Sequence, residues 1–152
     1  MVYTEKSSRR DVMSITSGFS RGMALATMME SNKSSLPSVL DRVLTAARVA
    51  EENRGQDIVI LDLRELTKSF DYFLIVSGSS RRQLYSIGDE IQKKLVKELG
   101  DECRSVCGHK EGRWIVIDYD DIVVHLFEPE TREYYALEEL WGKGVRIDHA
   151  LH

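Results

Sequence analysis

The stretch EGRWIVIDYDDIVVHLF, residues 111–127, decides the fold. Two apolar, β-branched runs flank Asp120 and Asp121, and a two-residue loop between such runs is typical of a β-hairpin. Side chains alternate between the faces of a strand, so this loop also sets which residues share a face. One face is apolar, and we assign it to the core: Tyr119 opposite Ile122, Ile117 opposite Val124, and Ile115 opposite Leu126.

The other face of the predicted hairpin is mixed. It pairs Trp114 with Phe127, Val116 with His125, and Asp118 with Val123. A sheet face turned to water should be mostly polar, whereas aromatic-rich, part-polar surfaces are typical of protein interfaces. The alternative is that the segment after the hairpin covers this face. The pattern alone leaves both interpretations open.

The rest of the chain alternates helical and strand patterns. Apolar spacing predicts a helix over 38–53 and a second over 81–99 that ends at Gly100. Strands are predicted at 57–63, 71–78 and 104–107, and helical turns at 129–141. This order predicts one α/β (α+β) domain over 36–145, with a mixed sheet of about five strands flanked by helices. Residues 146–152 are expected to be a short tail.

Residues 1–35 differ from the rest of the chain. They hold all five methionines and many serines, with little periodic apolar pattern. We expect a disordered or low-order extension. A transit peptide is the alternative, although Glu5, Asp11 and Glu30 weaken it. The chain has no apolar run near the ~20 residues of a membrane span. We therefore expect a cytoplasmic protein, or an organellar one if the extension is a transit peptide.

Charge and cysteine usage narrow the partners. The net charge of −4 disfavours binding that rests on nucleic-acid phosphates and suits a basic protein partner, with little direct RNA contact.

In an extended strand, Cys103 and Cys107 would lie roughly 13 Å apart, too far for a disulfide or a shared metal. We interpret both as reduced thiols, and the zinc alternative with His109 is disfavoured.

An enzymatic interpretation starts from the hairpin acids. Asp118, Asp120 and Asp121, with Gly-Ser-Ser at 78–80, resemble the metal-binding elements of magnesium-dependent nucleotidyltransferases. The acids follow the Gly-Ser element by about forty residues, which is too far for that pattern, and aspartates are common in turns for backbone reasons alone. His125 has no nearby nucleophile. We therefore predict no catalysis, no metal and no cofactor.

Four segments together resemble the Iojap-like family, the ribosomal silencing factors (RsfS). They are GQDIVILDL (55–63), DYFLIVSGSSRRQ (71–83), EGRWIVIDYDDIVVHLF (111–127) and REYYALEELW (132–141). The resemblance implies a nucleotidyltransferase-like fold without that activity. It also implies silencing of translation, in which the domain binds ribosomal protein fourteen of the large subunit and blocks joining of the small subunit. Relatives in organelles act in large-subunit assembly.

The resemblance favours the interface interpretation of the mixed face. The partner-binding residues that it implies lie on the hairpin and in the aromatic segment after it: Trp114, Val116, Asp118, Val123, His125, Phe127, Tyr135, Leu137, Leu140 and Trp141. Asp120 departs from the family, which usually has glycine there. If that position requires a positive φ, Asp is among the few tolerated substitutes. The free chain is expected to be a monomer or a homodimer.

Overall fold

The computed structural model describes residues 37–108 and 110–151. Its elements follow in this order: α3 (Val39–Glu52), β1 (Gln56–Asp62), β2 (Tyr72–Ser77), α4 (Arg81–Leu99), β3 (Ser105–Cys107), β4 (Trp114–Asp118), β5 (Ile122–Phe127), α5 (Pro129–Tyr135), α6 (Leu137–Leu140), β6 (Val145–Ile147) and the 3-10 helix η1 (His149–Leu151). Every predicted element is present, and β6 was not predicted. The expectations for residues 1–35 and for His109 fall outside the described residues.

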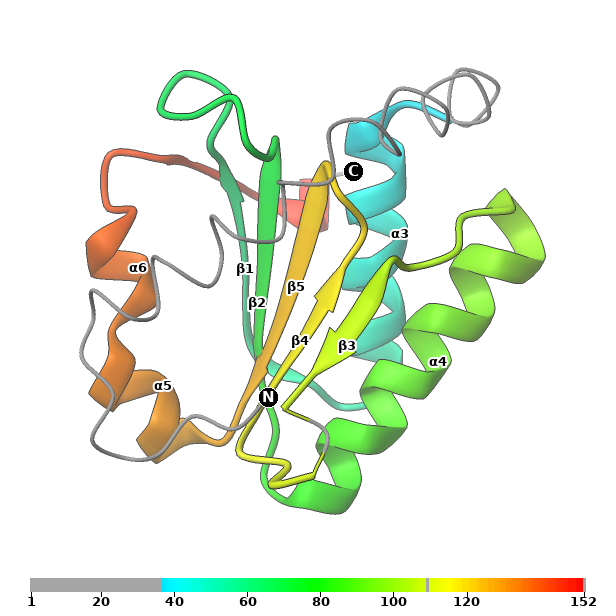
Figure 1. The fold of residues 1–152 in the computed structure, drawn as a ribbon, viewed down its shortest axis with the longest axis vertical. Coiled ribbons are helices and arrows are strands. Elements are labelled where there is room, and N and C mark those ends of the chain that lie inside the picture. The colour runs from blue at the N-terminus through cyan, green and yellow to red at the C-terminus, as the bar shows by residue number, and fades with distance from the viewer. Residues whose placement is uncertain (1–36, 109, 152) are drawn as a thin grey trace.

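The six strands form one mixed sheet in the order β3-β4-β5-β2-β1-β6 (Figure 1). The central pair, β2 and β5, is parallel, and the other neighbours are antiparallel. The expected boundary at residue 145 was wrong, because β6 pairs with β1 and so belongs to the sheet. A three-residue strand with mostly exposed side chains has no periodic apolar signal by which sequence could reveal it.

Both long helices begin and end as their sequences predict. The Ser38 side chain accepts a hydrogen bond from the Asp41 amide at the start of α3. Ser80 does the same for the Gln83 amide at the start of α4, and the Gln83 side chain accepts from the Ser79 amide. Gly100 ends α4 in the left-handed conformation, with φ of 66°. These bonds satisfy amide groups that a helix end leaves unpaired.

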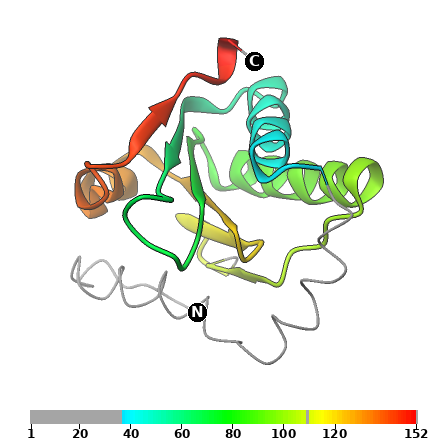
Figure 2. The same ribbon diagram turned by 90° about the horizontal axis from the view of Figure 1, so that it is seen from above.

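The sheet has two differently covered faces. The helices α3 and α4 lie side by side on one face (Figure 2), over an aliphatic cluster that includes the hairpin residues assigned to the core. On the other face, α5 and α6 pack against an aromatic cluster that includes Phe73, Trp114 and Phe127. We call these the aliphatic face and the aromatic face.

Candidate partner-binding site

The hairpin has the predicted register. Trp114 pairs with Phe127, Val116 with His125, and Asp118 with Val123. The amide of Tyr119 donates to the carbonyl of Ile122 across the turn, at 2.8 Å. Asp120 has a φ of 76°, so this residue adopts the left-handed region, the condition under which Asp was expected to be tolerated there.

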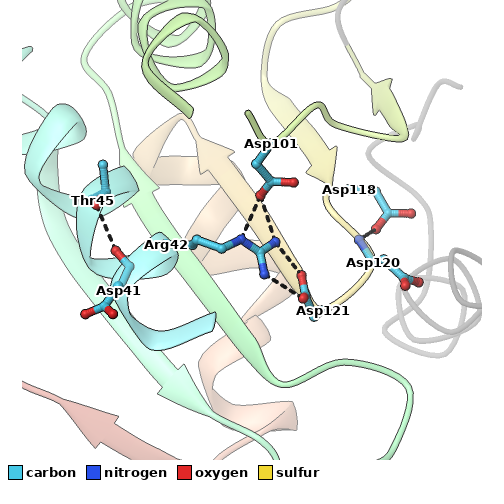
Figure 3. A network of polar contacts seen from close by, with 7 residues as sticks. All are labelled: Asp41, Arg42, Thr45, Asp101, Asp118, Asp120 and Asp121. Atoms are coloured by element: carbon cyan, nitrogen blue, oxygen red, sulfur yellow. Dashed lines mark hydrogen bonds and ion pairs between the residues drawn. The ribbon is translucent and has the colours of Figure 1, made fainter. Parts of the chain in front are cut away.

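Two hairpin carboxylates at this turn bind arginines. The Arg42 guanidinium lies between Asp101 and Asp121 and donates two hydrogen bonds to each, at 2.7–2.9 Å (Figure 3). Burial alone would lower the pKa of Arg42, but the hydrogen bonds and charges of both carboxylates raise it overall. Arg104 pairs with Asp120 at 2.6 Å. The guanidinium of Arg42 thus ties α3 to the end of α4 and to the hairpin turn.

Asp118 has a local structural contact as well. Its side chain is buried and accepts a hydrogen bond from the Asp120 amide at 2.7 Å, which holds the turn closed (Figure 3). Among the described residues, no group of three or more His, Cys, Asp or Glu side chains could hold a metal ion. The acids that resemble metal ligands in sequence therefore act here as turn and helix partners.

The mixed face of the hairpin is buried, so its own side chains do not form the exposed interface that the resemblance favours. Trp114 is only 4% exposed, and its ring stacks on Phe127 and packs against Tyr135, with centroids 5.0 and 4.9 Å apart. Trp141 contacts Phe73 edge-on at 5.6 Å. Of the ten predicted partner-binding residues, nine are buried and Leu140 is partly buried. The C-terminal segment packs on this face, which is the alternative left open by the sequence.

His125 lies at the centre of this face and is fully buried. The Trp114 indole N–H donates to its Nδ1 at 3.2 Å, so the neutral ring carries its proton on Nε2. Burial lowers the pKa of His125 to about 3. No described residue accepts a hydrogen bond from Nε2. The ring is therefore neutral at physiological pH and serves as a packed, polar member of the core.

The helices over the aromatic face are short, and Arg132 connects them to the sheet. The Nε of Arg132, in α5, donates to the Glu138 carboxylate in α6. Its Nη1 donates to the Asp57 carbonyl and the Ser77 hydroxyl of the sheet. Ala136 joins α5 to α6 in the left-handed conformation, with φ of 46°, a region that costs a non-glycine residue roughly 1–2 kcal/mol. The cover thus depends on a few polar bonds and a strained joint.

Comparison with known proteins gives the same family as the motifs. The family described as "Ribosomal silencing factor during starvation" matches residues 36–151. The chain belongs to the ribosomal silencing factor (RsfS) family. This confirms the resemblance carried by the four segments and indicates ribosome-associated regulation.

Individual relatives agree with this placement. The chain is 40% identical over 103 residues to ribosomal silencing factor RsfS of Bacillus subtilis, which covers 68% of this chain and 86% of that protein. It is 34% identical over 92 residues to mouse "Mitochondrial assembly of ribosomal large subunit protein 1", covering 59% and 40%. A crystal structure of a Chromobacterium violaceum protein matches with a TM-score of 0.67 and 35% identity, over 70% of this chain and 88% of that one.

Sequence reasoning missed Tyr134, an exposed aromatic residue that lies next to the buried aromatic cluster. Tyr134 is 54% exposed, and its ring meets Tyr135 edge-on at 5.0 Å. Because Tyr135 packs on Trp114, the exposed ring rests on the aromatic face. The adjacent pair Tyr134–Tyr135 was the available signal, since on a short helix two consecutive residues point in different directions.

None of the helices in the described ranges could cross a membrane.

Proposed function

We propose that this chain silences ribosomes by binding the large subunit through ribosomal protein fourteen and by sterically blocking the small subunit. Membership of the RsfS family, over residues 36–151, carries the proposal. Joining of two subunits needs a bare interface, so a domain bound there acts by the volume it occupies. Such a mechanism uses no catalysis, cofactor or metal.

We place the contact at the surface of the aromatic face. Most of the ten residues predicted from the hairpin and the C-terminal segment are buried, so they form the packed layer beneath this contact surface. Tyr134 and the partly exposed Leu140 extend from that layer toward the partner. An exposed aromatic ring fixed by buried neighbours loses little conformational freedom on binding, which is the property of interface anchors.

The charge distribution supports a basic protein partner. Carboxylates gather where β1 and β4 end and β2 and β5 begin, but Asp62, Asp120 and Asp121 are paired with arginines there, so the support for a cationic partner is the net charge of −4. Burial, and then repulsion from Asp121, raises the pKa of Asp71. A field of this sign accelerates association with a cationic protein and fixes its orientation.

A second candidate function is large-subunit assembly. The mouse relative is named for that role in mitochondria, and a factor that holds the same surface of an immature subunit would use the same contact. We place the chain in the cytoplasm, with an organelle as the alternative if residues 1–35 are a transit peptide. Finding the chain mainly on incomplete large subunits would favour assembly.

The experiment is sedimentation of the purified chain with separated subunits, followed by a subunit-joining assay. We expect recovery with large subunits only, and inhibition of joining. Tyr134→Ala should weaken binding roughly thirtyfold, because losing a central aromatic anchor costs about 2 kcal/mol. The matched control is Val145→Ala, since Val145 is 63% exposed but lies on the edge strand β6. Equal recovery with both subunits would refute the proposal, and an unaffected Tyr134 variant would move the contact elsewhere.

A further inference from the structure

One end of the sheet carries exposed cations from three separate segments. Gln83 at the start of α4 donates to the carbonyls of Asn53 and Arg54. The Gly78 amide donates to the Phe127 carbonyl, and the Glu128 amide donates to the Arg113 carbonyl. These bonds bring together the segments 53–55, 78–82, 110–113 and 127–128, which we call the basic end. Its exposed cations are Arg54, Arg81, Arg82, Lys110 and Arg113.

The β3–β4 turn lies directly against the first of the α4 arginines. A Cβ added to Gly112 would lie 2.4 Å from the Cγ of Arg81, and the φ of Gly112 is 66°. A side chain there would need Arg81 to move and would lie in the left-handed region, so the turn that carries Lys110 and Arg113 is packed onto the α4 N-terminus. The cations of the two segments are thereby held on one surface.

The pairing of these cations differs from that of the arginines elsewhere. Five arginines outside the basic end form ion pairs with carboxylates: Arg42, Arg64, Arg104, Arg132 and Arg146. Within the described part of the chain, Arg54, Arg81, Arg82 and Lys110 form no ion pair. The four segments contain two acids, Glu111 and Glu128, both partly buried, and the first turn of α4 contains none.

This distribution selects the chemistry of the partner. The net charge of −4 conceals a positive end, and exposed guanidinium groups match phosphate oxygens in charge and in planar, bidentate geometry. The N-terminus of α4 adds amide dipoles of the same sign. We propose that the basic end binds the phosphate backbone of RNA. Resting on the proposed function, this RNA belongs to the large subunit and provides a second contact beside the protein contact.

The test compares two double variants of the full chain with matched charge change. Arg81→Glu with Arg82→Glu reverses the basic end, and Lys93→Glu with Lys97→Glu reverses two exposed lysines farther along the same helix. Acids at a helix N-terminus are favourable, so the first variant should fold. Arg81→Gln with Arg82→Gln is the reserve variant. Circular dichroism and thermal melting verify folding in each case.

The dissociation constant is measured for purified large subunits over a potassium chloride series, and for isolated ribosomal protein fourteen. We expect the Arg81/Arg82 variant to bind large subunits at least about tenfold more weakly. For this variant, the slope of log K against log salt should become less steep by about two. Its binding to the isolated protein should be unchanged, and the Lys93/Lys97 variant should behave like the wild type. An unchanged affinity and slope would overturn the proposal. An equal loss toward the isolated protein would also overturn it, since the basic end would then bind protein.

A third arm separates this proposal from the proposed function. The wild-type chain is titrated at low salt with an RNA duplex of about twenty base pairs, long enough for several phosphate contacts. Binding that the Arg81/Arg82 variant loses supports the basic end even if the wild type fails to bind subunits, in which case only the silencing role fails. Absence of RNA binding by the wild type, or equal RNA binding by the wild type and the Arg81/Arg82 variant, overturns only the proposal that the basic end binds RNA.

Discussion

The two faces of the sheet are both buried but are built differently. The aliphatic face is covered by α3 and α4, of 14 and 19 residues, with capped ends. The aromatic face packs against α5 and α6, of 7 and 4 residues, whose starts have no side-chain cap. Its core includes a histidine, two tryptophans and a carboxylate. Burial therefore does not require a long amphipathic helix, and aromatic rings can form a core under short ones.

The largest loss of stability is expected when a charged side chain is placed in the core on either face of the sheet. Trp114→Glu should abolish cooperative folding, because truncating a buried tryptophan alone costs about 3–5 kcal/mol and a buried charge adds to that. Val124→Glu, on the aliphatic face, should do the same. Thermal unfolding followed by circular dichroism provides the measurement. A Trp114 variant that melts within a few degrees of the wild type would show that the aromatic face is open to water.

The next largest effect concerns the network that joins the aliphatic cover to the hairpin turn. Arg42→Met leaves Asp101 and Asp121 without their guanidinium, and removing one partner of a buried ion pair costs about 3–5 kcal/mol. Urea unfolding at neutral pH measures this loss. The control is Arg64→Met, which removes a pair whose arginine is largely exposed and should have a far smaller effect. Equal effects of the two variants would contradict a structural role for the buried network.

A smaller effect should distinguish the faces by pH. Above pH ~6.5, His125 is neutral in the folded and unfolded states. As the pH falls toward its folded pKa of about 3, the unfolded chain binds a proton first, so stability is lost at about 1.4 kcal/mol per pH unit. His125→Asn keeps an acceptor for Trp114 and should remove about 2 kcal/mol of the difference between pH 7 and pH 5. Parallel urea titrations of both proteins test this, and identical pH dependences would refute it.

The smallest effect sharpens the contrast between the covers. Ala136→Gly removes the left-handed strain between α5 and α6 and should raise stability by roughly 0.5–1 kcal/mol, after the extra entropy of glycine in the unfolded chain is subtracted. Differential scanning calorimetry would show a melting temperature higher by a few degrees. A lower melting temperature would mean that the alanine methyl group is a packing contact rather than a source of strain.

The same contrast explains what sequence could predict. The hairpin register, both long helices and the positive φ of Asp120 follow from local patterns: strand alternation, capping residues and a position that requires the left-handed region. Burial of the aromatic face depends on how the segment directly after the hairpin folds back, and its helices of 7 and 4 residues are too short to carry a clear periodic pattern. Strand β6 was missed for the same reason. The basic end was missed because net charge says nothing about where exposed cations gather on the surface.

The parallel pairing of β2 with β5 has a kinetic consequence. Tyr72 pairs with Ile122, so closing this central ladder also closes the chain loop that contains α4, β3 and β4. The β4–β5 hairpin, by contrast, joins neighbours in the chain and can form on the microsecond scale. Closing the longer loop costs entropy before any contact compensates for it. Refolding should therefore be limited by docking of the hairpin onto β2, and hairpin-turn mutations should slow refolding more than mutations in β6.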